Sequence, residues 1–379
     1  METEIFKVAS RKDLKKFIRF QLELYKGNPY WCPPLIFDEL NTLGKDKNPA
    51  FEYCEAEYWL AYRDGKIVGR IAGIINKKAN ERWKENFVRF GWIDFIDDTE
   101  VSSKLIETVA EWGRNKGMTA IQGPLGFTDM DPEGMLVEGF EELSSLAAIY
   151  NYPYYPEHLV KLGFRKGVDW IHFDMDVPPV IPDKVSRLAS IAKEKYHLRT
   201  VAAKKAKDFL PYTKNLFRMM NVAFGDLYGY AALNDRQIDL FIKQYFGFIR
   251  PEFVSLVIDD KDDVVAFGVT IPEMTAALQK CNGRLFPFGF IHLFRALKKN
   301  DSIHMYLIGV RPDYQGRGAL ALVYYELHKA YLQHGIVKAT THAQLEKNLK
   351  AISIWKNYES RIYIRRRCWE KHFGNGSGY

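Results

Sequence analysis

The segment that ends a strand at Val310 and opens onto a helix at Ala319 carries the residues best suited to chemistry. Pro312 lacks a backbone N–H and stops the strand, and the loop Gln315-Gly316-Arg317-Gly318 follows. Glycines let a ligand approach the backbone closely, and the first N–H groups of a helix point toward one place together with the positive end of its dipole. Arg317 adds a positive charge. The pattern therefore predicts an anion site, and a pyrophosphate suits it.

Other interpretations of this loop can be compared with that one. A Walker-type phosphate loop is excluded because no Gly-Lys-Ser or Gly-Lys-Thr follows. A dinucleotide fold is disfavoured, since one Gly-x-Gly without a third glycine is a weak signal. A third interpretation, a plain strand-to-helix turn that binds no ligand, is not excluded by the sequence. Structural zinc and a disulfide framework are not expected, because the cysteines are scattered without a Cys-x-x-Cys pair, at Cys32, Cys54, Cys281 and Cys368.

The same segment resembles the acetyl-CoA loop of the GCN5-related N-acetyltransferases (GNAT), whose signature is Gln/Arg-x-x-Gly-x-Gly/Ala. Gln315 and Gly318 match the signature, whereas Leu320 stands where the family prefers Gly or Ala. A Val-x-Pro strand end precedes the loop, and Asn348 and Ala351 follow with the family's Asn-x-x-Ala spacing. The resemblance implies a bound acetyl-CoA or other acyl-CoA. The cofactor contacts that it implies are the backbone of Ile308 and Val310, the loop residues Gln315, Gly316, Arg317, Gly318, Ala319 and Leu320, and the side chain of Asn348.

The resemblance also implies direct acyl transfer, in which an amine attacks a thioester carbonyl held by backbone amides. Donors of this kind are worth roughly 100- to 1000-fold each. The family often places a tyrosine seven residues after the asparagine to protonate the departing thiolate. Trp355 stands there instead, and an indole N–H is too weak an acid for that role. Tyr358, about one helical turn further on, could substitute.

Three residues are candidates for the base that deprotonates the amine. His304 lies on the strand before the loop, two residues from Tyr306 and so on the same face. Glu346, at the start of the last helix, and His342, on a neighbouring strand, are its competitors. The sequence does not choose between them.

Two halves of the chain present the same order of predicted elements: hairpin, strand, helix, strand, helix, strand. The first half has predicted strands at 57–63, 66–76, 88–96, 119–122 and 168–177, with helices after Asp98 and before Gly163. The second half has predicted helices at 206–224, 234–248, 319–334 and 348–358, and strands at 253–258, 264–271, 303–310, 337–342 and up to about Trp369. Prolines 178, 179 and 182 mark a boundary, so we predict domains at 1–178 and 179–379.

The first half resembles the same family only in outline. Its Asp64-Gly65 hairpin and its Leu162-Gly163-Phe164 match family features, but an acidic stretch from Asp97 to Glu100 replaces the phosphate-binding signature. Such a loop would repel a pyrophosphate. We therefore predict an α/β (α+β) protein with two tandem GNAT-like domains, each a mixed central β-sheet flanked by helices, of which the N-terminal one is degenerate.

The leading functional hypothesis is an N-acyltransferase that uses acyl-CoA and a small-molecule or peptide amine acceptor. The alternatives are a transferase that takes a long-chain acyl group or an aminoacyl-tRNA, supported by Leu320 and a basic C-terminal segment, and a non-catalytic GNAT-fold binding protein. The net charge of +7 comes without a nucleic-acid reader motif, so only tRNA remains as a nucleic-acid partner. No secretory signal and no run of about 18 apolar residues is found, so we expect a cytoplasmic protein. The stretch from Asn282 to Phe290 offers an apolar lid or acyl groove.

Overall fold

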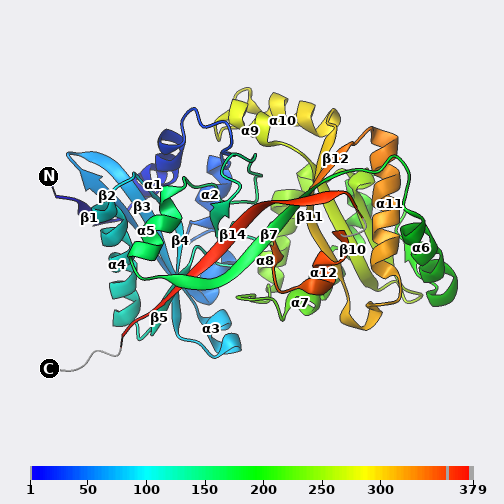
Figure 1. The fold of residues 1–379 in the computed structure, drawn as a ribbon, viewed down its shortest axis with the longest axis horizontal. Coiled ribbons are helices and arrows are strands. Elements are labelled where there is room, and N and C mark those ends of the chain that lie inside the picture. Colours follow the sequence, from blue (N-terminus) through cyan, green and yellow to red (C-terminus); the bar gives the residue numbers. More distant parts are fainter. Residues whose placement is uncertain (1, 356–357, 375–379) are drawn as a thin grey trace. The chain divides into compact units, whose positions relative to one another are not determined.

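The computed structural model describes residues 2–355 and 358–374, which divide between two compact units (Figure 1). The first unit comprises Met1–Ile171, Thr275–His292 and Tyr363–Tyr379, and the second comprises His172–Met274 and Leu293–Ile362. Both units are therefore discontinuous along the chain. The predicted domain limits of 1–178 and 179–379 stay a prediction about which parts fold alone.

The first unit is built on a mixed sheet with the strand order β1-β2-β3-β4-β5-β14. β1 to β4 are antiparallel neighbours, β4 and β5 are parallel, and β14 is antiparallel to β5 and to the short β6. The strands are β1 (Glu4–Lys7), β2 (Cys54–Arg63), β3 (Lys66–Asn76), β4 (Phe87–Phe95), β5 (Ala120–Gly123), β6 (Met135–Glu138) and β14 (Ser360–His372). The helices are α1 (Arg11–Leu24), α2 (Ile36–Thr42), α3 (Lys77–Trp83), α4 (Thr99–Asn115), α5 (Tyr154–Lys161) and α9 (Thr275–Cys281), with a 3-10 turn at Pro49–Glu52.

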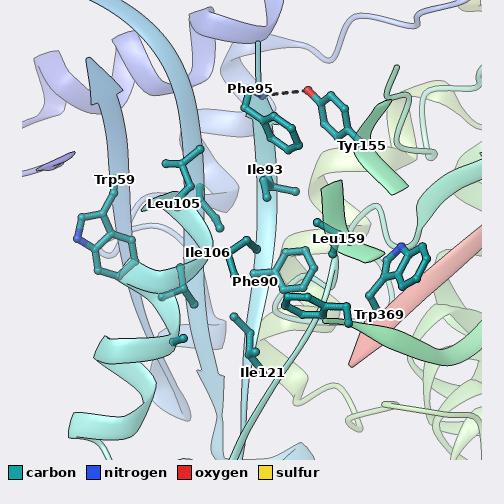
Figure 2. Close-up of a cluster of buried hydrophobic side chains, with 14 of the residues drawn as sticks. Trp59, Phe90, Ile93, Phe95, Leu105, Ile106, Ile121, Tyr155, Leu159 and Trp369 are labelled. Atoms are coloured by element: carbon teal, nitrogen blue, oxygen red, sulfur yellow. Dashed lines mark hydrogen bonds between the residues drawn. The ribbon is translucent and has the colours of Figure 1, made fainter. Parts of the chain in front are cut away.

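Alternating side chains of β2 divide the core of this unit between two faces of the sheet. Trp59 belongs to one buried cluster, with Leu105 and Ile106 of α4, and Figure 2 shows that cluster. Tyr58 belongs to the other, with Phe17 of α1. Because successive strand residues point to opposite faces, a helix on each side is what this pattern requires.

The second unit has a mixed sheet with the order β7-β12-β11-β10-β9-β8. β11 and β12 are parallel, whereas β12 with β7, β10 with β11, β10 with β9 and β8 with β9 are antiparallel. The strands are β7 (Arg165–Asp176), β8 (Arg199–Thr200), β9 (Val254–Ile258), β10 (Val264–Pro272), β11 (Ser302–Val310) and β12 (Lys338–Thr341), with a short β13 (Gln344–Leu345). The helices are α6 (Asp183–Tyr196), α7 (Leu210–Phe224), α8 (Asp235–Tyr245), α11 (Ala319–His334) and α12 (Leu349–Ile352), with 3-10 turns at Ala206–Phe209, Phe246–Phe248, Pro251–Phe253 and Pro312–Tyr314. The helix α10 (Gly289–Lys298) begins in the first unit and continues into the second.

The last strand of each predicted repeat is exchanged. β7 follows the helices of the first half, yet its residues Asp174 to Asp176 pair with β12 of the second unit. β14 follows the helices of the second half, yet its residues Trp369 to His372 pair with β5 of the first unit. The exchange places the C-terminal part of β14 in the first unit, while the second unit is interrupted because Thr275–His292 also belongs to the first.

One predicted helix is much shorter than expected. The sequence predicted a helix over 348–358, whereas α12 covers only Leu349–Ile352. Ile352, Ser353 and Ile354 are weak helix formers, and the Ser353 hydroxyl donates to the Lys350 carbonyl oxygen at 2.8 Å, which competes with continuation of the helix. Residues 356–357 of the predicted helix lie outside the described residues.

Candidate functional site

The last part of the loop between β11 and α11 leaves most of its backbone donors unused. Gly316 and Gly318 have φ angles of 77° and 78°, a left-handed conformation that glycine adopts without strain. Within the described chain, the N–H groups of Gly316 and of residues 318–321 donate no hydrogen bond, and no side chain caps α11. These donors lie at the positive end of a 16-residue helix, so the loop can bind an anion.

The side chains around this loop fix its conformation. The Tyr314 hydroxyl donates to Asp259 Oδ2 at 3.0 Å, and the Arg317 guanidinium lies 4.9 Å from the centre of the Tyr314 ring. A Cβ on Gly318 would come within 2.5 Å of the carbonyl oxygen of Leu188 on α6, so only glycine fits there. At Gly316 a Cβ would meet nothing within 4 Å, and the space before the helix is open.

β11 has an open edge beyond Met305. β12 pairs with β11 from Ser302 to Met305, whereas β10 follows β11 as far as Val310. Residues 307–310, which include the predicted Ile308 and Val310, therefore have a strand partner on one side only among the described residues. Leu307 pairs with β10 next to Met305, so Tyr306 is an extra residue in a β-bulge. Backbone groups on such an edge can bind an extended ligand as a further strand would.

Three histidine rings gather beside the bulge. The His342 ring centre lies 5.8 Å from that of His304, 5.9 Å from that of His172 and 5.5 Å from that of Tyr306. His304 and His172 are buried, and their Nδ1 atoms lie 2.9 Å from Thr340 Oγ1 and 3.1 Å from a carbonyl oxygen of β12. His342 is only half-buried. Of the three, it is the most exposed to solvent.

Trp355 and Tyr358 form an aromatic group further along the chain. Trp355 is buried, and its indole N–H donates to Gln344 Oε1 at 2.9 Å. Its ring contacts those of Tyr324 at 5.7 Å and Tyr358 at 6.1 Å. Burial raises the pKa of the Tyr358 phenol, so this group keeps its proton. Trp355 thus packs against its aromatic neighbours. Of the two residues, only Tyr358 carries a proton suited to acid catalysis.

The remaining predicted residues lie in the same unit. Asn348 accepts a hydrogen bond from the Ala351 N–H at 3.3 Å and caps α12 through its Oδ1, which leaves its amide nitrogen for a ligand. Glu346 is half-buried in the turn between β13 and α12. Leu320 is half-buried in the first turn of α11, and Gln315 is exposed.

Sequence reasoning missed two members of this group. His172 belongs to β7 and comes next to His342 only because β7 joins the second unit, an exchange that no local pattern signals. The bulge at Tyr306 was missed as well, because a bulge is a mismatch between two strands and leaves no mark on one of them. Among the described residues, no group of three or more histidine, cysteine or carboxylate side chains is arranged to hold a metal, and no helix is long and apolar enough to cross a membrane.

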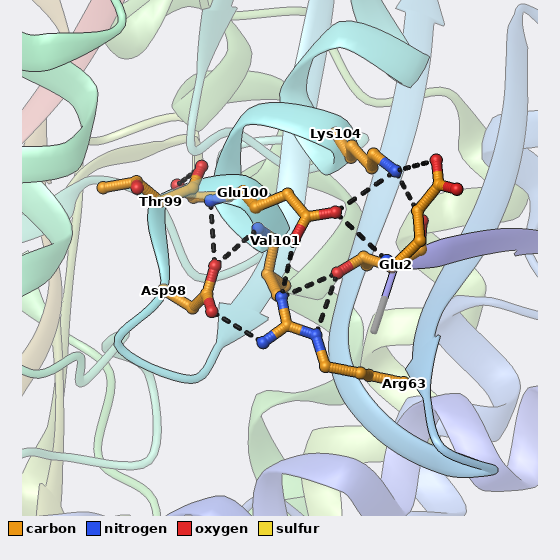
Figure 3. Close-up of polar contacts among 9 residues, drawn as sticks. Glu2, Arg63, Asp98, Thr99, Glu100, Val101 and Lys104 are labelled. Carbon is orange, nitrogen blue, oxygen red and sulfur yellow. Dashed lines mark hydrogen bonds and ion pairs between the residues drawn. The ribbon is translucent and has the colours of Figure 1, made fainter.

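The corresponding connection in the first unit is closed by charge (Figure 3). Three residues, from Ile96 to Asp98, separate β4 from α4. The Asp98 carboxylate accepts hydrogen bonds from the N–H groups of Glu100 at 2.9 Å and Val101 at 3.2 Å, and Arg63 pairs with it at 2.7 Å. The end of α4 already holds an anion of its own, so this connection offers nothing to a phosphate.

The strand end in the first unit is filled as well. The Phe95 N–H donates to the Tyr155 hydroxyl at 3.0 Å, and the two rings stack at 4.2 Å (Figure 2). Tyr25 and Tyr155 both donate to Asp94 Oδ1, and all four side chains are buried. Where β11 has an open edge, β4 runs into packed core.

No protein-family model matches the chain. Protein YghO of Escherichia coli (strain K12) is 27% identical over 373 residues, which cover 96% of this chain and 93% of that protein. A bacterial ceramide synthase of Caulobacter vibrioides is 26% identical over 383 residues, with 98% and 97% covered. A tandem GNAT protein from the clavulanic acid biosynthesis pathway superposes with a TM-score of 0.56 at 13% identity and covers 98% of both chains. The predicted resemblance and fold class are confirmed: the chain has the α/β fold of the tandem GCN5-related N-acetyltransferases.

Proposed function

We propose that the protein is an N-acyltransferase that moves an acyl group from coenzyme A to an amine, with binding and chemistry both in the second unit. The observation that carries the proposal is the row of unused amides at Gly316 and 318–321 next to the open edge of β11. The residues fit the cofactor's pyrophosphate, because donors, helix dipole and open space at Gly316 coincide there.

Binding is divided between the loop and the strand. The loop amides and Arg317 hold the anionic end, and the edge from Leu307 to Val310 holds the extended arm. The amide nitrogen of Asn348 is a further donor toward that arm. When bound, the cofactor supplies an acyl group on a thioester, whose carbonyl carbon an amine can attack.

His342 is the base that we assign to the reaction. It is half-buried beside the Tyr306 bulge, whereas His304 lies deeper and keeps its Nδ1 on Thr340. His342 takes a proton from the attacking amine, and His304 fixes the position of its ring. Tyr358 holds the proton that the thiolate receives when the carbon–sulfur bond breaks. Glu346 is the remaining candidate base, further along the chain toward α12.

A second candidate concerns the substrates. The Caulobacter relative is named a ceramide synthase and matches this chain over nearly its full length. A ceramide is the amide of a long-chain amino alcohol and a fatty acid. Leu320, in place of a small residue, adds apolar surface at the start of α11. We therefore propose long-chain acyl transfer to an amphipathic amine as the specific form of the reaction.

Isothermal titration with acetyl-CoA and with a long-chain acyl-CoA tests the binding site. Arg317→Glu should weaken binding of both by roughly 10- to 100-fold, because a charge-assisted contact becomes a repulsion. Gly318 is unsuitable for this test, since any side chain there meets Leu188. Lys329→Glu is the matched control: it makes the same charge change at an exposed position toward the other end of α11. Equal affinities in wild type and Arg317→Glu would remove the loop from the proposal.

A further inference from the structure

The chain carries an exposed apolar and basic segment, residues 280–299, that the proposed reaction does not use. Its tip is the loop between α9 and α10, where Phe286 is 78% exposed and Phe288 is 70% exposed. On α10, Phe294 is 58% exposed and Ile291 is also exposed. We call residues 280–299 the docking segment.

α10 separates its two faces by helical spacing. Leu293 and Leu297 are buried, one turn apart. Ile291, Phe294 and Lys298 recur at three- and four-residue intervals on the exposed side, with Arg295 beside them. The exposed side of α10 therefore gathers apolar and basic side chains on one surface.

The charge of the segment has one sign. Between Glu273 and Asp301 the chain contains five Lys or Arg residues and no Asp or Glu. The five are Lys280, Arg284, Arg295, Lys298 and Lys299. None of them forms an ion pair with a carboxylate in the part of the chain that the structure describes. The positive charge therefore stays available to a partner.

The loop that holds the exposed phenylalanines is fixed. The Cys281 thiol donates to the Gly289 carbonyl oxygen at 3.0 Å, which joins the end of α9 to the start of α10. The Gly283 carbonyl oxygen accepts from the Ile36 N–H at 3.0 Å, and Gln279 donates to the carbonyl oxygens of Pro29 and Trp31. Little conformational entropy remains to be lost when the tip is buried, so the apolar area can contribute to binding nearly in full.

We infer that the docking segment binds the surface of an anionic lipid bilayer, with Phe286, Phe288 and Phe294 at the boundary of the acyl region and the basic side chains at the headgroups. Exposed aromatic residues on a basic amphipathic helix are the pattern of interfacial membrane binding. Protein interfaces, by contrast, are depleted in lysine. The inference rests on no step of the proposed reaction, although a bilayer is also where a long-chain acceptor would reside.

Vesicle flotation with the full chain tests the inference. Vesicles of phosphatidylcholine mixed with phosphatidylglycerol should bind the protein, vesicles of phosphatidylcholine alone should bind it much less, and salt should weaken the binding. Phe286→Ser with Phe288→Ser should reduce partitioning roughly 100-fold through lost apolar burial. Arg295→Glu with Lys298→Glu should reduce it by roughly 30-fold or more through charge.

Matched controls separate this surface from general stickiness. Phe6→Ser with Val160→Ser removes two exposed apolar side chains elsewhere, and Lys12→Glu with Lys15→Glu reverses two exposed charges on α1. Both controls should bind vesicles like the wild type. Acyl-CoA titration of all variants should be unchanged, which keeps this test independent of the proposed function.

Three results would overturn the inference. They are absence of vesicle binding by the wild type, equal loss in the control variants, and undiminished binding by both docking-segment variants. Sedimentation that shows a wild-type dimer, made monomeric by Phe286→Ser with Phe288→Ser, without vesicle binding, would assign the surface to a second copy of the chain instead.

Discussion

Each unit has a strand followed by a helix that packs on the sheet: β4 and α4 in the first unit, β11 and α11 in the second. The two units differ in whether the backbone groups between strand and helix are free. In each, a glycine on the second strand of the hairpin lets the helix sit close to the sheet. A Cβ on Gly69 would come within 2.7 Å of Leu105 on α4, and one on Gly268 within 2.7 Å of Val323 on α11. This arrangement of strand and helix therefore does not determine whether a site is present.

The difference lies in the connection that follows the strand. Eight residues, 311–318, join β11 to α11 and leave amides free, whereas three residues, 96–98, join β4 to α4 and end in a carboxylate cap. Beyond the connection, the edge of β11 is open while Phe95 is stacked on Tyr155. The short connection uses the amides at the start of its helix internally, whereas the long glycine-containing one leaves such amides available to a ligand.

The largest expected effect is a fall in kcat when one histidine is replaced in the second unit, compared with a replacement in the first. His342→Gln should lower kcat about 100- to 10,000-fold with little change in the Kd for acyl-CoA, because it removes the proposed base. His158→Gln is the control: His158 is buried in the first unit, where its Nδ1 lies 2.9 Å from Ser102 Oγ. That change should lower Tm and leave kcat per folded molecule unchanged. Release of free CoA thiol, with a long-chain amino alcohol as acceptor, measures turnover.

If His342→Gln kept full turnover while Glu346→Gln lost it, the base would move to Glu346. A fall in kcat with His158→Gln that matched the loss with His342→Gln would show that the first unit takes part in chemistry.

A smaller effect is expected at Tyr358. Tyr358→Phe should lower kcat by roughly 10- to 100-fold, because a thiolate whose conjugate acid has a pKa near 8.5 leaves with only modest help from an acid. Burial raises the pKa of Tyr358 above its usual value of 10, so the proton is present throughout the neutral range. The loss should therefore be the same at pH 7 and pH 9. Tyr325→Phe, at a half-buried tyrosine on α11, is the matched change and should have no effect.

Local signals in the sequence predicted elements of both units. α11 begins and ends where glycines at 318 and 335 place its limits, and the hairpin at Asp64-Gly65 joins β2 to β3 as expected. Predicted site residues from His304 to Tyr358 all fall in one unit. These features depend on turn chemistry and periodicity, which act within a few residues.

What the sequence could not predict depends on pairing across long distances. The exchange of β7 and β14 changes which strands border β12 and β5, although each strand alone has an ordinary pattern. His172 enters the histidine cluster through that exchange. The apolar docking segment was predicted only as a lid or groove, because exposure of Phe286 and Phe288 is a property of packing.

The smallest effect concerns the cap of α4. Asp98→Ala should destabilise the protein by about 1 kcal/mol in urea unfolding at pH 7, since it removes a helix cap. Asp98→Asn should cost less, because asparagine caps as well and only the pair with Arg63 is lost. The hydrogen bond from Arg63 holds the pKa of Asp98 below its usual value. A lowered folded-state pKa gives stability that is complete above the unfolded value near 4 and is lost as the pH falls through the folded value. The difference between wild type and Asp98→Asn should therefore shrink below about pH 4.

The Asp98→Ala variant also tests which feature of the first unit excludes acyl-CoA. Removal of the carboxylate frees the amides of Glu100 and Val101, but the connection still has three residues and the strand end is still filled by Tyr155. We therefore expect Asp98→Ala to bind acyl-CoA with the same stoichiometry as the wild type, for which we propose one acyl-CoA per chain. A second equivalent in the titration would mean that the cap alone excludes the cofactor, and that loop length and the filled strand end are secondary.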